Sequence, residues 1–232
     1  GDHRYLHSYP TRRSSDLISI SGWVVAEAET AQAVYIVPVE GEITPAMAAF
    51  LESRLTEASR NNAIGVIIEI STLGGRVDSA IQMRDAIIAS EVPVVVYIAN
   101  RAISAGALIS IASDTIVMAP GSHIGAAEPV PNEPKALAYV SGEFRTTAEL
   151  TGRDPQVAMA MVDKTIEIAG LIGAGEILDL TANEALEWGY ADHLANNRTE
   201  VLEVMGWASA PLVEEEPDFR FRMAQFLTRY EI

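Results

Sequence analysis

Apolar runs alternate with amphipathic stretches along the first half of the chain. Short runs rich in β-branched residues predict buried strands, and each of the first three precedes a segment with apolar residues at helical spacing. The predicted strands are Val34–Val39, Gly65–Ile70, Val94–Ile98 and Thr115–Met118. The predicted helices are Pro45–Arg60, Val77–Ser90 and Ala105–Ala112. This strand-then-helix order predicts an α/β fold with largely parallel pairing.

The pattern after residue 130 predicts mostly helices with one further strand pair. Long amphipathic stretches predict helices at Pro134–Leu150 and Pro155–Val162. Two short apolar segments, Glu167–Ile168 and Ile177–Leu180, predict paired strands. Thr181 is suited to cap a following helix, because its hydroxyl can accept a backbone N–H of the first turn; that helix is predicted over Ala182–Trp188.

Composition narrows the possible functions. With 232 residues and 49% apolar content, the chain can bury one substantial core. A formal charge of −16 argues against nucleic acid, because an acidic surface repels phosphates. There is no cysteine, which excludes thiol catalysis, disulfides and thiolate metal sites. We expect no metal and no cofactor.

Both ends of the chain differ from the middle. Residues 1–16 lack apolar periodicity, and Leu17–Val25 followed by Ala26-Glu-Ala28 is typical of the end of a signal peptide, with a short strand or arm as the alternative. Near the other end, Pro211–Pro217 is predicted to be an acidic linker, followed by the mixed apolar and basic segment Phe219–Thr228. We therefore predict a non-native or signal-derived arm over 1–32, one domain over 33–200, and a linker and tail over 201–232. No apolar run reaches the roughly 18 residues needed to span a bilayer.

Ser104 is the strongest candidate for a catalytic residue. It lies between the strand ending near Ile98 and the helix predicted from Ala105, and small residues surround it in Ser104-Ala-Gly-Ala. A serine at a strand-to-helix turn is exposed to a substrate carbonyl, and the following N–H, that of Ala105, can point at the developing oxyanion. The position predicts nucleophilic, hydrolytic chemistry.

A serine nucleophile needs a base, and the chain offers few. The histidines are His3, His7, His123 and His193, and the lysines are Lys135 and Lys164. His123 lies nineteen residues after Ser104 and stays possible. Lys135 lies in the first turn of a predicted helix, where the helix dipole and partial burial would favour its neutral, basic form. Lys164 lies among charged residues and has the character of a surface residue.

A second backbone feature precedes the helix predicted at Val77. Gly74 and Gly75 follow a predicted strand, and two consecutive glycines let a ligand backbone approach closely. The N–H of Gly75 is therefore a candidate second oxyanion donor. Together with Ser104 at the end of the next strand, it forms a possible active site.

Between Ala33 and about Ala195 the chain resembles the membrane-bound serine proteases of the ClpP class, often called NfeD-type proteins, within the ClpP/crotonase fold. The order and spacing of several motifs carry this resemblance: Thr72-Leu-Gly-Gly-Arg, Val92-Pro-Val, Ser104-Ala-Gly-Ala, Met118-Ala-Pro-Gly, Ile124-Gly-Ala-Ala-Glu-Pro129, Pro134-Lys135, Gly152-Arg153 and Leu180-Thr-Ala-Asn-Glu-Ala-Leu. It implies a superhelix of repeated β-β-α units with a mostly parallel sheet. It also implies a Ser/Lys dyad of Ser104 and Lys135, oxyanion donors at Gly75 and Ala105, and substrate contacts at Gly74 and Arg76.

The resemblance also helps to identify the general base. The histidine of the soluble ClpP proteases falls near Ala127 of this chain, so His123 is out of register with a Ser-His-Asp arrangement. Two departures from the family pattern occur. Leu73 stands where the family commonly has proline before the double glycine, and the loop from Pro129 to Lys135 is short.

We therefore expect a serine endopeptidase that cleaves accessible or apolar segments of membrane-associated proteins. The resemblance implies a stomatin-like membrane protein as substrate or partner, self-association into a dimer or larger oligomer, and membrane helices beyond this chain. The catalytic domain would then be an extracytoplasmic, soluble portion of an anchored protein. Two alternatives stay open: crotonase-type acyl-CoA chemistry, which shares the fold and the use of backbone N–H donors, and a non-catalytic scaffold for membrane assembly.

Overall fold

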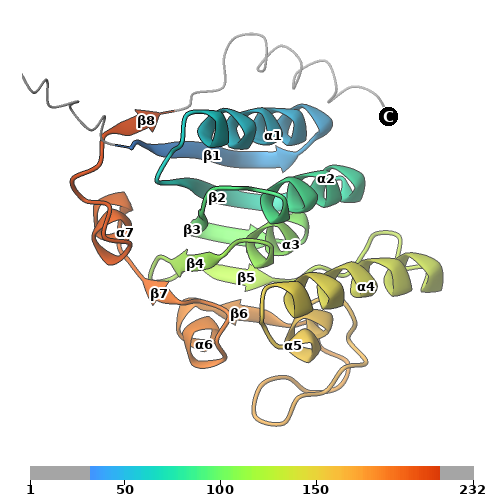
Figure 1. The fold of residues 1–232 in the computed structure, drawn as a ribbon. Helices are drawn as coiled ribbons and strands as arrows, with labels where there is room; N and C mark the ends of the chain where they lie inside the picture. Colours follow the sequence, from blue (N-terminus) through green and yellow to red (C-terminus); the bar gives the residue numbers. More distant parts are fainter. Residues whose placement is uncertain (1–31, 215–232) are drawn as a thin grey trace, which may run out of the picture. The chain divides into compact units, whose positions relative to one another are not determined.

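Strands and helices alternate along residues 32–214, the part of the chain that the computed structural model describes (Figure 1). The strands are β1 (Val34–Ile43), β2 (Gly65–Gly75), β3 (Val94–Ile103), β4 (Thr115–Met118), β5 (His123–Gly125), β6 (Asp179–Thr181), β7 (His193–Leu194) and β8 (Leu212–Glu214). The helices are α1 (Pro45–Arg60), α2 (Val77–Ile88), α3 (Ala105–Ile111), α4 (Pro134–Leu150), α5 (Pro155–Ala160), α6 (Ala182–Glu187) and α7 (Arg198–Val204).

These strands form one sheet in the order β6-β5-β3-β2-β1-β8, with β4 beside β3 and β7 beside β4. Strand β3 pairs with β4 along its first half and with β5 along its second half. Within residues 32–214 every pair of named strands is parallel except β5 with β6. The predicted α/β fold with a mostly parallel sheet is therefore confirmed.

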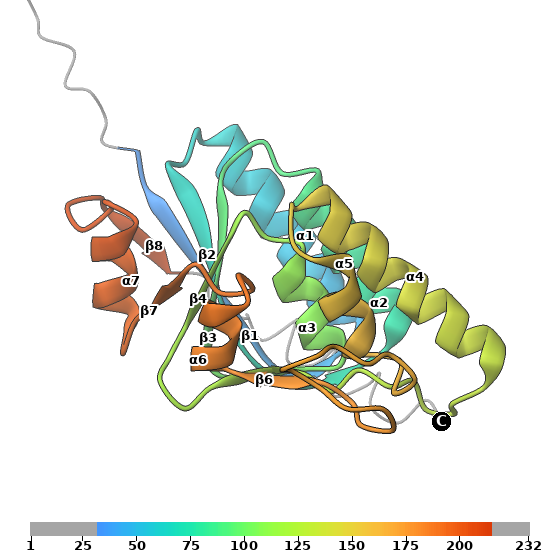
Figure 2. The same ribbon diagram turned by 90° about the horizontal axis from the view of Figure 1, so that it is seen from below.

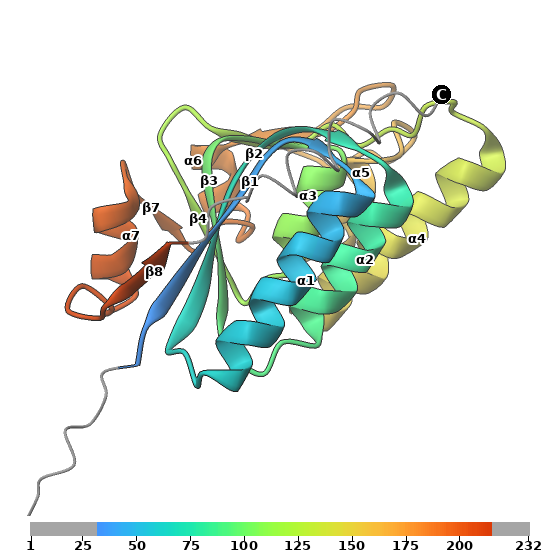
Figure 3. The same ribbon diagram turned by 90° about the horizontal axis from the view of Figure 1, so that it is seen from above.

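Helices cover both faces of the sheet, which explains the nearly continuous apolar runs of the strands. Helices α1 to α5 lie on one face, and α7 lies on the other (Figures 2 and 3). The larger apolar cluster joins Ile68 of the sheet to Leu51 of α1 and Phe144 of α4. The smaller cluster on the opposite face includes Tyr97 of β3 and Val201 of α7.

The first three strands extend beyond their predicted ends. Strand β2 continues to Gly75 and β3 continues to Ile103, so both reach the residues singled out for catalysis. The apolar pattern stops earlier because polar residues, among them Asn100 and Arg101, occupy the ends of these strands. The pairing continues through irregularities in register, one of them between Ile70 and Thr72 of β2.

The predicted strand pair after α5 is wrong. Ile168 makes only an isolated bridge with Ile172, and β6 pairs instead with β5, a strand that was not predicted. A three-residue strand offers too few positions for a periodic signal. The predicted cap of α6 is confirmed, because Thr181 Oγ1 accepts the N–H of Glu184 and the Glu184 carboxylate accepts the N–H of Thr181.

Residues after 195 add to the same sheet. Helix α7 spans the boundary expected after residue 200, and β8 pairs in parallel with the start of β1, although its residues were predicted to belong to a linker. The signal-like stretch Leu17–Val25 and the tail segment Phe219–Thr228 lie outside the described residues. Of the helices within residues 32–214, none combines the length and the apolar content that crossing a bilayer requires.

Candidate active site

Ser104 lies at the junction of β3 and α3, in a backbone conformation that few non-glycine residues adopt. Its φ is 56° and its ψ is −115°. Hydrogen bonds hold it on both sides: its N–H donates to Gly125 O at 2.9 Å, and its carbonyl oxygen accepts the N–H of Ala107 at 3.0 Å. Strain of this kind persists only where the surrounding structure fixes it, and it is common at catalytic nucleophiles.

Gly74 of the glycine pair lies against Ser104, whereas Gly75 lies against Ile43 of β1. A methyl group added at Gly74 would lie 2.8 Å from Ser104 Cβ and 3.2 Å from Ser104 Oγ. Behind the serine, a methyl group at Gly106 would lie 2.4 Å from Thr72 Cγ2, so α3 packs directly against β2. Glycine at these two positions allows Ser104 and the start of α3 to lie against β2.

The strand pairing around Gly75 and the start of α3 bear on the two predicted oxyanion donors, the N–H groups of Gly75 and Ala105. The N–H of Arg76 donates to Ile43 O of β1 at 2.9 Å. Successive N–H groups of an extended strand point to opposite edges, so the N–H of Gly75 points to the edge of β2 that faces β3 and Ser104. Ala105 is the first residue of α3, and its N–H therefore has no acceptor within the helix.

The two lysines differ in their contacts. Lys164 Nζ lies 3.0 Å from Glu128 Oε1, so its ammonium group is bound. Lys135, in the first turn of α4, is exposed rather than partly buried as expected, because that turn lies on the surface. Among residues 32–214, neither the Lys135 ammonium nor the Ser104 hydroxyl makes a hydrogen bond or ion pair. The dyad therefore stays a prediction.

The histidines lie elsewhere in the site or outside it. His123 Nδ1 is 2.7 Å from Asp179 Oδ2. His123 pairs in register with Arg101, whereas Gly125 pairs with Ile103, the residue before Ser104. His193 is exposed at β7, and His3 and His7 precede the described residues. At the register position of the ClpP histidine, Ala127 is 3% exposed and carries no base.

A groove of about 570 Å³ lies at the ends of β1, β2 and β3, beside the glycine pair. Glu42, Asn100 and Arg101 line it beside Gly74 and Gly75. These three polar residues were not predicted to belong to a site, although polar side chains at the end of an apolar strand can indicate one. No group of three or more His, Asp or Glu side chains within the described range is arranged to hold a metal ion.

Leu73 and Arg76 flank the glycine pair in the sequence. Leu73, which replaces the proline common in the family, is 70% exposed. Arg76, expected to contact substrate, is the cap residue of α2, and its Nη2 lies 2.6 Å from Asp78 Oδ2. This ion pair lowers the pKa of Asp78, with hydrogen bonds from Ser79 adding to the effect.

Comparison of the sequence with known proteins shows which family the chain belongs to. The profile of the NfeD1b N-terminal domain matches residues 33–215. The membrane protein NfeD1b of Bacillus subtilis is 36% identical over 219 residues, which cover 91% of this chain and 50% of that protein. The membrane-bound protease PH1510 of Pyrococcus horikoshii is 30% identical over 183 residues, covering 73% and 39%. The chain thus spans half or less of the length of these curated relatives.

Solved structures extend the comparison. A lysine-to-alanine mutant of the 1510-N membrane-bound stomatin-specific protease, in complex with a substrate peptide, superposes with a TM-score of 0.72 at 26% identity, covering 86% of this chain and 99% of the other. ClpP1 of Listeria monocytogenes shares the fold, with a TM-score of 0.58 at 21% identity over 72% and 94% of the two chains. The chain belongs to the NfeD1b N-terminal domain family and has the ClpP-like fold.

Proposed function

We propose that this chain is the catalytic domain of a serine endopeptidase, with Ser104 as the nucleophile. The observation that carries the proposal is the position of Ser104, held at positive φ between β3 and α3 with its side chain against Gly74. Two relatives support it: PH1510 is named a protease, and 1510-N was studied as both a serine-to-alanine and a lysine-to-alanine mutant.

In the proposed mechanism Lys135 acts as the general base. Its neutral amine takes the proton of Ser104 Oγ while that oxygen attacks the peptide carbonyl. The N–H groups of Gly75 and Ala105 donate to the oxyanion of the tetrahedral intermediate. The Lys135 ammonium returns the proton to the leaving amine, and an activated water then hydrolyses the acyl-enzyme and frees Ser104.

The contacts of the two lysines favour Lys135 over Lys164 as the base. Lys164 is bound to Glu128, whereas Lys135 is exposed and makes no hydrogen bond or ion pair with residues 32–214. The serine and lysine replaced in the 1510-N mutants are 41 positions apart in their chain, whereas Ser104 and Lys135 are 31 apart. Because this connection is shorter, we propose that Lys135 reaches hydrogen-bonding distance of Ser104 only in the substrate complex. Catalytic hydrogen bonds often form only at that stage.

The proposed substrate is an extended peptide. Beyond Thr72 and Ala102 the ladder between β2 and β3 ends, so the backbone of Leu73–Gly75 has a free edge beside Ser104. Exposed Leu73 favours apolar residues in that peptide, and Gly74 and Arg76 would contact it. Because 1510-N is described as stomatin-specific and both curated relatives as membrane proteins, we propose a stomatin-like membrane protein as substrate. We further propose that the domain self-associates and faces the outside of the cytoplasm.

The proposal is tested by replacing Ser104 and Lys135 separately with alanine and measuring cleavage of apolar peptides. Each change should lower kcat/KM at least about 1,000-fold, because each removes a group that takes part in bond making. Ser141→Ala and Lys164→Ala are matched controls on exposed or half-exposed side chains and should keep full activity. Full activity of Ser104→Ala would refute the serine mechanism, and full activity of Lys135→Ala would refute the dyad.

A further inference from the structure

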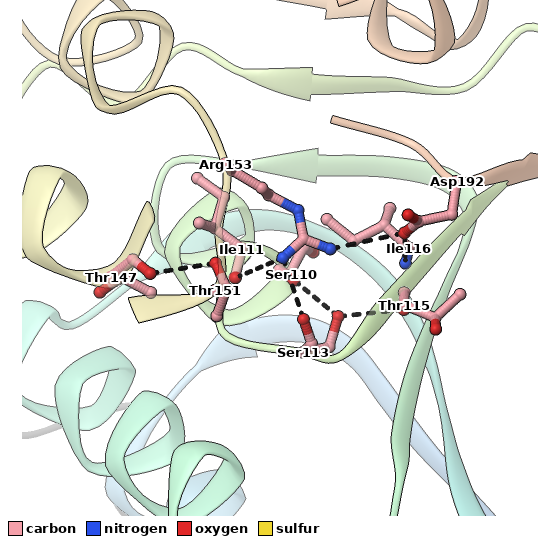
Figure 4. Close-up of polar contacts among 9 residues, drawn as sticks. All are labelled: Ser110, Ile111, Ser113, Thr115, Ile116, Thr147, Thr151, Arg153 and Asp192. Atoms are coloured by element: carbon pink, nitrogen blue, oxygen red, sulfur yellow. Dashed lines mark hydrogen bonds and ion pairs between the residues drawn. The ribbon is translucent and has the colours of Figure 1, made fainter. Parts of the chain in front are cut away.

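The carboxyl end of α3 is held by a buried arginine from a distant part of the chain. Arg153 enters from the turn between α4 and α5, and its Nη1 donates to Ile111 O at 3.2 Å and to Ser113 O at 3.0 Å (Figure 4). The last carbonyls of a helix lack partners within the helix, and Arg153 satisfies one of them together with a carbonyl just beyond it.

The arginine is itself fixed in place. Its side chain is 5% exposed, and its Nη2 lies 3.5 Å from Asp192 Oδ2. The same carboxylate oxygen accepts the N–H of Ile116 of β4 at 2.8 Å (Figure 4). The backbone N–H of Arg153 donates to Ala148 O at 2.8 Å. Burying a cation is costly unless it is paired and hydrogen-bonded, so this arrangement is a strong constraint on the geometry around it.

Helix α3 connects this constraint to the nucleophile. All seven of its residues are buried, and it is about 10 Å long at 1.5 Å per residue. Its amino end carries Ser104, whose side chain makes no capping hydrogen bond. A buried helix moves as a unit, so a displacement at Ile111 is passed to Ser104. Misplacement of a catalytic group by about 1 Å can cost about 100-fold in rate.

We propose that Arg153 is a positioning residue for Ser104, which it holds in place by capping the opposite end of α3. This inference rests on the proposed peptidase function. It predicts that replacing Arg153 slows the acylation of Ser104 even under conditions in which the variant is fully folded.

The test compares Arg153→Met with Arg198→Met in the whole 232-residue chain. Arg198 is the matched control, because it binds Glu69 at 2.6 Å and 2.8 Å and Glu214 at 2.8 Å on the sheet face opposite α3. Urea unfolding defines conditions in which each variant is fully folded. There, Arg153→Met should lower kcat and the rate of Ser104 labelling by a fluorophosphonate about 10-fold or more at unchanged KM. Arg198→Met should change neither rate, and Arg153→Lys should recover part of the loss.

Hydrogen exchange supplies a readout that does not need activity. The N–H groups of Ala107 and Leu108 both donate to Ser104 O, at 3.0 Å and 3.4 Å. They should exchange faster in Arg153→Met than in Arg198→Met. Equal exchange and equal labelling rates in the two folded variants would overturn the inference. Failure of the wild-type chain to cleave peptide or react with the probe would refute the peptidase proposal instead, while the exchange rates would still decide the role of Arg153.

Discussion

Two neighbouring strand-to-helix turns, β2 to α2 and β3 to α3, use different residues to make a similar sharp change of direction. The first turn contains Gly74, at a φ of +110°, where the absence of a side chain removes the steric cost. The second turn contains Ser104, at a φ of 56° and a ψ of −115°, where a side chain makes the conformation costly. The costly conformation belongs to the residue that we propose as the nucleophile.

The starts of the two helices differ in the same way. Asp78 lies in the first turn of α2, accepts the N–H of Ser79 at 2.8 Å and pairs with Arg76. The first turn of α3 has no acidic residue. The start of α2 is thus closed by its own side chains, whereas no side chain caps the start of α3. In the proposed mechanism the first turn supplies a backbone donor and the second supplies the nucleophile.

The largest effect is expected from Gly75→Ala. The added methyl group would lie 2.3 Å from Ile43 O and 2.5 Å from Ile43 N, and backbone atoms of a paired strand cannot move aside cheaply. We expect the free energy of unfolding to fall by roughly 3 kcal/mol or more, as measured by urea denaturation. Gly142→Ala in α4, where nothing lies within 4 Å, is the control and should be neutral or stabilising. Equal stability of the two variants would show that the first turn is not tightly constrained.

The second-largest effect on stability is expected from relieving the backbone strain at Ser104. Both Ser104→Gly and Ser104→Ala remove the hydroxyl, but only glycine adopts this φ and ψ without steric cost. We expect Ser104→Gly to exceed Ser104→Ala in free energy of unfolding by about 1–2 kcal/mol, with neither variant active. Chemical denaturation of the two variants measures the difference. If alanine proves equally stable, the second turn stores no strain and the contrast between the turns is lost.

The sequence was sufficient for the fold because its core is built from long apolar runs. The strands around Ile68 and Val96 and the helices that cover them have strong periodic signals. It was insufficient for β5 and β8, three-residue strands whose pairing depends on partners far along the chain. The length of β3 was also missed, since the polar residues Asn100 and Arg101 at its end resemble a loop.

The candidate site was predictable to the extent that it is built from local backbone. Ser104 beside Gly74 follows from two adjacent parallel strands that end at the same edge of the sheet. Lys135 was correctly predicted in the first turn of a helix, but its position relative to Ser104 was not predictable, because a loop determines it. Arg153 was noted only as part of a motif, since its role depends on tertiary contacts with Ile111, Ser113 and Asp192.

A smaller effect on stability is expected from Ala126→Gly, in the turn that follows β5. Ala126 has a φ of 44° and follows the strand that binds the Ser104 backbone. Glycine should raise the free energy of unfolding by about 0.5 kcal/mol, since the gain at positive φ is partly offset by chain entropy. Asn62→Gly, at a φ of 50°, is the control and should change less, because asparagine tolerates this region. A larger gain at Asn62 would mean that positive φ alone does not distinguish the site.

The smallest effect should come from Asp78→Asn, which opens the start of α2 so that it resembles that of α3. The pair with Arg76 lowers the pKa of the Asp78 carboxyl, so the folded state favours the carboxylate. This stabilisation is fully present above the ordinary aspartate pKa of about 4 and is lost as the pH falls below it. Because the pair is exposed and screened, it should be worth less than about 1 kcal/mol. Urea midpoints at pH 7 and pH 3 should therefore differ slightly less in Asp78→Asn than in the wild type. An unchanged difference would show that the carboxylate does not close the first turn of α2, and the contrast between the two turns would then rest on glycine and serine alone.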